Sequence, residues 1–157
     1  MKKLLVTLAI GCVGLLGCTH RQAAESVWLT DWPAAQTQAR AEGKLVFLDF
    51  TGSDWCPACI LFHDEVAMSP EFAAYAKTNL VLMEVDFPKR HRQSDAVVQA
   101  NREMVNKFKV ADASGEFPLP TLMLVDSNGK ELARWLGYRA GSGAKAFIAQ
   151  LEAFKTK

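Results

Sequence analysis

The fold is decided by the stretch Thr51-Gly52-Ser53-Asp54-Trp55-Cys56-Pro57-Ala58-Cys59, which places two thiols one helical turn apart. It follows the short apolar run 45–50, which favours a buried strand, and it precedes apolar residues spaced for one face of a helix. Cys56 is therefore expected at a helix N-terminus, where unpaired N–H groups and the helix dipole lower the pKa of a thiol. Pro57 suits the first helical turn, since its missing N–H would have no partner there. We expect Cys56 to attack a disulfide as a thiolate and Cys59, one turn deeper, to resolve the mixed disulfide.

A Cys-x-x-Cys pair is also half of many zinc sites, so the motif alone leaves two chemistries open. The chain has four cysteines, and the other two, Cys12 and Cys18, lie in an N-terminal apolar segment, which leaves no second pair for a four-sulfur site. His63 follows Cys59 by four residues and can face the same side of the helix. A copper-handling or zinc site made of Cys56, Cys59 and His63 is therefore the alternative to redox chemistry, and a plain structural disulfide is a third interpretation.

The N-terminus has the pattern of an export signal. Two lysines at positions 2 and 3 precede an apolar run over residues 4–16, which is shorter than the roughly 18 residues of a membrane-spanning helix. Leu15-Leu16-Gly17-Cys18 resembles a bacterial lipobox, and this resemblance implies cleavage before Cys18 and lipidation of its thiol. Thr19 follows, and a residue other than Asp there implies sorting to the outer membrane. An ordinary secretory signal with an accidental cysteine is the alternative.

We expect residues 1–17 to be a signal peptide, 18–27 a tether and 28–157 a single domain. Removing the signal peptide leaves 140 of the 157 residues, which is enough chain to bury a core. Subtracting its two lysines from the 18 basic residues leaves 16 against 17 acidic ones, a formal net charge of −1. This balance suggests neither nucleic acid nor a charged membrane surface as a partner.

Apolar periodicity and turn residues predict alternating helices and strands, an order typical of an α/β fold. Gly43 ends the first helix, and Asn128-Gly129 joins two strands in a hairpin. A later helix reaches Phe108 and carries Val97 and Val98 in its apolar stripe. The expected strands cover residues 45–50, 80–85, 121–125 and 131–136; the expected helices start at Thr30 or Asp31, span 56–67, and start again at Ser69, at Ser94 or Asp95, and at Ser142.

This order, with Cys-x-x-Cys after the strand 45–50, resembles the thioredoxin superfamily over nearly the whole chain downstream of the signal. Trp55 directly before Cys56 is the family's usual aromatic neighbour, and Leu119-Pro120-Thr121 resembles its cis-proline segment. The resemblance implies a thioredoxin-like fold, with a central mixed β-sheet flanked by helices, a Cys56–Cys59 disulfide, and no cofactor or resident metal. A cis proline there would leave the preceding backbone facing the cysteines, free to pair with an extended substrate. The implied substrate-binding residues are Trp55, Leu119, Pro120 and Thr121.

Asp49 is a candidate proton acceptor. Thioredoxins keep a buried acid in the strand before the motif, and Asp49 matches it if the intervening loop has gained one residue. A buried Asp49 could take the proton of Cys59 as that thiol attacks the mixed disulfide. The alternative is a strand-end carboxylate that bonds loop amides. Ala58 offers no charge or donor to the Cys56 thiolate, which favours a fairly reducing protein.

Two segments, 87–94 and 111–118, are longer than a minimal thioredoxin-like chain needs. The first contains Lys89-Arg90-His91-Arg92, the only local charge cluster in the sequence. It is either a solvated loop or a surface for an acidic partner protein. Asp54 is expected as a turn residue near the cysteines.

The sequence thus predicts an exported thiol–disulfide oxidoreductase that reduces protein disulfides. The run 50–56 is similar to that of exported bacterial thioredoxin-like proteins, among them relatives of the C-terminal domain of the transmembrane thiol reductant exporter. The expected partners are exported proteins with disulfides, an exported or membrane thiol donor, and the membrane through a lipid on Cys18. The expected location is the bacterial cell envelope, at the periplasmic face of the outer membrane. The same exchange run backwards would make an oxidant, and the sequence leaves that direction open.

Overall fold

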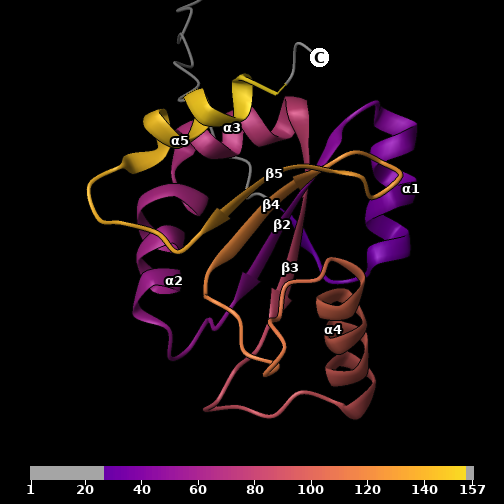
Figure 1. The fold of residues 1–157 in the computed structure, drawn as a ribbon. Helices are drawn as coiled ribbons and strands as arrows, with labels where there is room; N and C mark the ends of the chain where they lie inside the picture. The colour runs from indigo at the N-terminus through magenta and orange to yellow at the C-terminus, as the bar shows by residue number, and fades with distance from the viewer. Residues whose placement is uncertain (1–26, 155–157) are drawn as a thin grey trace, which may run out of the picture.

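A mixed five-stranded sheet forms the centre of the computed structural model, which describes residues 27–154 (Figure 1). Its strands are β1 (Trp28–Leu29), β2 (Leu45–Thr51), β3 (Leu80–Asp86), β4 (Thr121–Val125) and β5 (Glu131–Leu136). The strand order is β1-β3-β2-β4-β5, in which β1, β3 and β2 run parallel while β4 and β5 complete an antiparallel hairpin beside β2. The predicted signal peptide, Cys18 and the tether up to residue 26 lie outside the described residues.

Helices cover both faces of this sheet. They are α1 (Trp32–Glu42), α2 (Pro57–Phe62), the π-helix η1 (His63–Ala67), α3 (Pro70–Asn79), α4 (Asp95–Lys107) and α5 (Gly143–Glu152). α1 and α4 pack on one face, and α2, α3 and α5 pack on the other (Figure 1). The predicted α/β fold, a central mixed sheet flanked by helices, is confirmed. None of these helices, all within residues 27–154, combines the length and the apolarity that a bilayer crossing requires.

Strand β2 supplies side chains to both cores because successive residues of a strand point to opposite faces. Val46, Leu48 and Phe50 are fully buried on the face that α1 and α4 cover. Phe47 is fully buried on the other face, where its ring centroid lies 5.7 Å from that of Phe72 and 5.8 Å from that of Phe147. These edge-on aromatic pairs add to the apolar burial. β2 is therefore held from both sides, which fixes the point where the chain leaves the sheet toward the cysteines.

Most of the predicted helix ends are confirmed. Asp31, Ser69 and Ser94 each accept a backbone N–H from the first turn of α1, α3 or α4, at 2.8, 3.1 and 3.4 Å. Gly43 ends α1 with a φ of +64°, a left-handed conformation that glycine adopts without steric cost. Ser142 does not cap α5, because its hydroxyl turns back and donates to a preceding carbonyl 3.1 Å away.

Three further expectations differ from the structure. β1 was not predicted, and it adds a short edge strand next to β3. The single helix expected over residues 56–67 is α2 followed by the wider turn of η1. Val97 was placed in the core but is 39% exposed. It lies one turn before Asn101 and two turns before Met104 and Val105, all of which are buried, so the stripe is right but the first turn of α4 extends past the core.

Candidate active site

The two cysteines of the motif form a disulfide at the start of α2, directly after the loop that follows β2. Cys56 is the N-cap residue, and its Sγ accepts the N–H of Cys59 at 3.3 Å. The Sγ of Cys59 in turn accepts the N–H of Gly52 at 3.5 Å. Cys56 is 5% exposed and Cys59 is 2% exposed. The predicted position at a helix N-terminus is confirmed, so backbone N–H groups stand ready to stabilise a thiolate on Cys56 after reduction.

The proline segment lies beside this disulfide at the same end of the sheet. The peptide bond between Leu119 and Pro120 is cis, as predicted. Thr121, which begins β4, pairs with Phe50 near the end of β2, and the carbonyl of Pro120 accepts the N–H of Gly137 at 2.8 Å. Figure 1 shows the connections β2–α2, β3–α4 and α4–β4 together at the lower end of the sheet.

Asp49 lies on β2 two residues after Phe47 and therefore faces the side that α2 covers. Its side chain is 6% exposed, and its Oδ1 has no hydrogen-bond partner among the residues that the structure describes. Burial raises the pKa of Asp49 well above its usual range, and the negative charges of Glu84 and Asp86 raise it further. Glu84 is its register neighbour on β3, and burial raises the pKa of that carboxyl as well. Oδ1 of Asp49 thus bonds no loop amide within the described residues, and the role of this carboxyl as a proton acceptor stays a prediction.

His63 does not join the cysteines. It begins η1 with its side chain 55% exposed, and its Nδ1 lies 3.4 Å from the carboxylate of Asp64. Within residues 27–154, no three His, Cys, Asp or Glu side chains gather in a way that could hold a metal ion. The alternative copper-handling or zinc site of Cys56, Cys59 and His63 therefore has no support from the geometry.

Asp54 ties the loop before Cys56 to the chain that follows β3. Its carboxylate accepts the backbone N–H of Lys89 at 2.9 Å and that of Arg90 at 2.7 Å, and it lies 3.1 Å from Nδ1 of His91. These contacts lower the pKa of Asp54, the N–H of Lys89 having the largest effect. Asp54 is a turn residue near the cysteines, as predicted, but its partners belong to the long segment 87–94.

Trp55 also connects the loop before Cys56 to the segment 87–94. Its Nε1 donates to the carbonyl of Phe87 at 2.7 Å, and the ammonium of Lys89 lies 3.5 Å from the centre of its ring. The indole packs closely on Gly52, where an added Cβ would lie 2.7 Å from Cε2 and from Nε1 of Trp55. Glycine at position 52 is therefore a condition for this placement of the ring.

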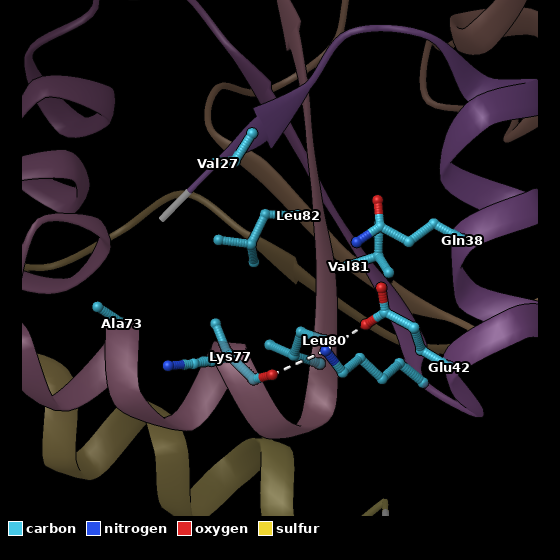
Figure 2. A pocket seen from close by; sticks show the side chains of 10 residues that line it. Val27, Gln38, Glu42, Ala73, Lys77, Leu80, Val81 and Leu82 are labelled. Carbon is cyan, nitrogen blue, oxygen red and sulfur yellow. Dashed lines mark hydrogen bonds and ion pairs between the residues drawn. The ribbon is translucent and has the colours of Figure 1, made fainter. Parts of the chain in front are cut away.

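A hollow of about 550 Å³ lies at the opposite end of the sheet, where β3 begins between α1 and α3 (Figure 2). Lys44 spans part of it, since its Nζ donates to the carbonyl of Lys77 at 2.7 Å and also pairs with Glu42. No cysteine or histidine lines this hollow. It contributes nothing to the chemistry of the disulfide.

The fold and the helix-capping disulfide together define a thioredoxin-like protein. The family model for the thioredoxin-like domain matches residues 32–155, and the chain belongs to this family. Disulfide bond reductase DsbH of Chlamydia pneumoniae is 34% identical over 134 residues, which cover 85% of this chain and 76% of that protein.

Solved structures agree with this relationship. A DsbH oxidoreductase structure is 33% identical and superposes with a TM-score of 0.74, covering 90% of this chain and 94% of that one. The oxidised C-terminal domain of Neisseria meningitidis DsbD is 21% identical, with a TM-score of 0.56 and coverage of 82% of this chain and 100% of that one. The second match shows a shared fold only. The sequence resemblance to the thioredoxin superfamily is thereby confirmed.

Sequence reasoning missed the residues that shape the cysteine loop. The Ser53 N–H and hydroxyl donate to the carboxylate of Asp86, at 2.9 and 2.7 Å. Asp86 ends β3, and the available signal was an acidic residue at the end of a buried strand. For Gly52 the sequence offers only a glycine three residues before Trp55. Its role becomes clear only when the position of the Trp55 ring in the fold is known.

Replacing Asp49 by Asn should change how stability depends on pH. A carboxyl whose pKa is raised on folding keeps a proton that the unfolded chain has released. Its contribution to stability is complete below the unfolded pKa and is lost as pH rises through the folded pKa. The unfolding free energy of the oxidised parent should therefore fall as pH rises above about 4, and Asp49→Asn should remove part of that fall.

Urea denaturation of both oxidised proteins, at pH values from about 5 to about 9, measures this difference. The two proteins are compared by how their unfolding free energy changes with pH. The absolute values are not compared, because a buried amide without a partner lowers stability at every pH. Parallel curves for the parent and Asp49→Asn would contradict the raised pKa.

Gly52→Ala should displace the Trp55 indole, because the new Cβ cannot occupy the space that the ring fills. The hydrogen bond from Trp55 to Phe87 should break or lengthen. The indole N–H resonance of Trp55 in ¹⁵N NMR, assigned by its loss in Trp55→Phe, should then shift, while those of Trp28 and Trp135 stay in place as internal controls. An unchanged Trp55 resonance would mean that the loop absorbs the methyl group.

Proposed function

We propose that this chain is an exported thiol–disulfide oxidoreductase that reduces protein disulfides through Cys56 and Cys59. The observation that carries the proposal is the Cys56–Cys59 disulfide at the N-terminus of α2, with the sulfur of Cys56 in the N-cap position. The reducing direction is supported by the 34% identity to a protein named as a disulfide bond reductase. Ala58 between the cysteines supports it as well, because it adds no charge or donor that would stabilise the thiolate.

In the first step, the Cys56 thiolate attacks one sulfur of a substrate disulfide. A bond forms between Cys56 and that sulfur, the substrate S–S bond breaks, and the other substrate sulfur leaves as a thiolate that takes a proton from solvent. Cys56 is suited to this step because the N–H groups at the start of α2 favour its anionic form. It is also the more exposed of the two cysteines.

In the second step, Cys59 loses its proton and attacks the sulfur of Cys56. The Cys56–Cys59 bond forms, the mixed disulfide breaks, and the second substrate thiol leaves, so the substrate gains two electrons and the protein dithiol loses them. Asp49 is the proposed acceptor of the Cys59 proton. Its raised pKa suits this role, because a carboxylate with a higher pKa takes a proton from a thiol more readily than an ordinary carboxylate does.

Substrate binding is assigned to the surface around the disulfide. Leu119 precedes Pro120 at the start of β4, where its backbone can pair with an extended substrate chain. Thr121 continues that strand beside β2. Trp55, directly before Cys56, is held in place by its hydrogen bond to Phe87.

The proposed setting is the bacterial cell envelope. Residues 1–17 would be removed as a signal peptide, Cys18 would carry the lipid, residues 18–27 would form a tether, and 28–157 would form the domain at the periplasmic face of the outer membrane. Two or more acyl chains give a stable anchor, whereas one gives only marginal binding. The proposed partners are exported proteins with disulfides and an exported or membrane thiol donor that reduces the Cys56–Cys59 bond again.

Cys59→Ser should trap the mixed disulfide, because the second step has lost its nucleophile. Mass spectrometry of the non-reduced protein, after the reduced variant meets a disulfide-bonded substrate such as insulin, should find substrate attached to Cys56. Cys56→Ser is the matched control and should accumulate far less adduct, while Asp49→Asn should hold it longer than the parent. Equal adduct on both single-serine variants would remove the assignment of roles.

Cys18→Ser should release the protein from the membrane, because the thioether that carries the lipid cannot form. Fractionation of cells that express each form should find the parent with membranes and the variant either soluble outside the cytoplasm or as an unprocessed precursor. Cys12→Ser is the control and should behave like the parent. A Cys18→Ser variant that is processed and membrane-bound like the parent would rule out lipidation at this residue.

A further inference from the structure

Residues 87–92, here named the basic loop, are hydrogen-bonded to the active-site loop. The carboxylate of Asp54 accepts the N–H groups of Lys89 and Arg90 at 2.9 and 2.7 Å. At the start of the basic loop, Phe87 donates its N–H to the carbonyl of Thr51 at 2.9 Å and accepts the indole N–H of Trp55 at 2.7 Å. The backbone of the basic loop is therefore positioned by residues directly before Cys56.

A third segment supports the basic loop from the other side. The rings of Phe87 and Phe117 meet edge-on, with centroids 5.2 Å apart. Phe117 lies in the long segment 111–118, which leads to Leu119 and Pro120. The basic loop thus stands beside both parts of the proposed substrate-binding surface.

The side chains of the basic loop carry positive charge, and within residues 27–154 only His91 lies at ion-pair distance from a carboxylate, that of Asp54. Lys89, Arg90, His91 and Arg92 are exposed, and among residues 27–154 neither Arg90 nor Arg92 has a carboxylate partner. Lys89 lies over Trp55.

The nearby carboxylates are mostly occupied by other groups. Asp54 accepts backbone N–H groups of the basic loop, and Asp86 accepts from Ser53. Asp112 accepts the N–H and hydroxyl of Ser114 within its own turn. Glu116 on the segment 111–118 and Asp95 at the start of α4 remain exposed. These carboxylates keep their negative charge, but within residues 27–154 none of them forms an ion pair with Lys89, Arg90 or Arg92, whose side chains are exposed.

We propose that the basic loop binds an acidic segment next to the reactive cysteine of the partner protein, an inference that rests on the proposed function. Guanidinium groups bind carboxylates through paired N–H donors, which suits Arg90 and Arg92 for Asp and Glu side chains. A positive rim beside the attacking sulfur also steers acidic chains toward it and raises their rate of encounter.

The position of the loop favours a protein chain over a lipid surface. Asp54 and Trp55, which hold the loop, directly precede Cys56. A ligand bound to Arg90 and Arg92 therefore lies on the loop that is joined to the residues directly before Cys56. A polypeptide that contains the reacting cysteine meets both sites at once, whereas a bilayer bound there would cover the sulfur that must react.

The test uses three short peptides, each with one cysteine in a mixed disulfide and differing only in two flanking residues: Asp, Ser or Lys. The second-order rate constant for reduction by the reduced protein is measured for each. At about 20 mM salt the Asp peptide should react about tenfold faster than the Lys peptide, and most of this preference should vanish at about 500 mM salt, where charges are screened beyond about 4 Å.

Three double variants test the contribution of Arg90 and Arg92. Arg90→Glu combined with Arg92→Glu should reverse the order, so that the Lys peptide reacts faster than the Asp peptide, which also shows that the variant is folded and active. Arg90→Lys with Arg92→Lys should keep the preference for Asp at a reduced size. Arg40→Glu with Lys77→Glu changes the same charge near the ends of α1 and α3, at the far end of the sheet, and should keep the parent's order.

The outcomes separate this inference from the proposed function. Equal rates for all three peptides would overturn the docking role alone, since exchange would still occur. Failure of every peptide to react would overturn the oxidoreductase and this inference together. If equal rates came with binding to phosphatidylglycerol vesicles that Arg90→Glu with Arg92→Glu abolishes, the loop would be assigned to lipid instead.

Discussion

The pairing of β2 with β3 on one side and β4 on the other governs the rest of the structure. Its register sets Thr51 opposite Asp86 and Phe50 opposite Thr121. Neighbouring strands lie roughly 4.8 Å apart, so the cysteine loop, the chain after β3 and the proline segment all meet at one edge of the sheet. A register shift of one residue would turn Phe47 to the opposite face of the sheet. It would thereby disrupt both the apolar core and the alignment of the segments that form the site.

Much of the fold could be predicted because its signals are local. The caps of α1, α3 and α4 and the hairpin turn at Asn128-Gly129 lie within a few residues of the elements that they determine. β1 could not be predicted, because two residues are too few to show a periodicity and its partner strand β3 is distant in the chain. The widened turn of η1 leaves the apolar pattern nearly unchanged. The exposure of Val97 depends on where the core ends beneath α4, which the sequence of that helix does not contain.

The residues of the site, too, were predictable where the signal is local and not where it depends on distant contacts. Cys56, Cys59 and the cis Pro120 follow from short motifs, and the burial of Asp49 follows from its place in an apolar strand. The contacts of Asp54 and Trp55 could not be predicted, since their partners lie more than 30 residues further along the chain. The charge run 89–92 was read correctly as exposed, but its fixed backbone is a tertiary property. Only the folded chain shows that the backbone of this exposed loop is hydrogen-bonded to residues directly before Cys56.

The bonds from Asp54 to the basic loop join the loop before Cys56 to the long segment after β3. Removing either one alone would leave a carboxylate or a pair of amides without partners, which is costly where water is partly excluded. The two features therefore depend on each other for their conformation. A graft of the basic loop onto a shorter thioredoxin-like chain would fold as it does here only if Gly52, Asp54 and Trp55 were transferred with it.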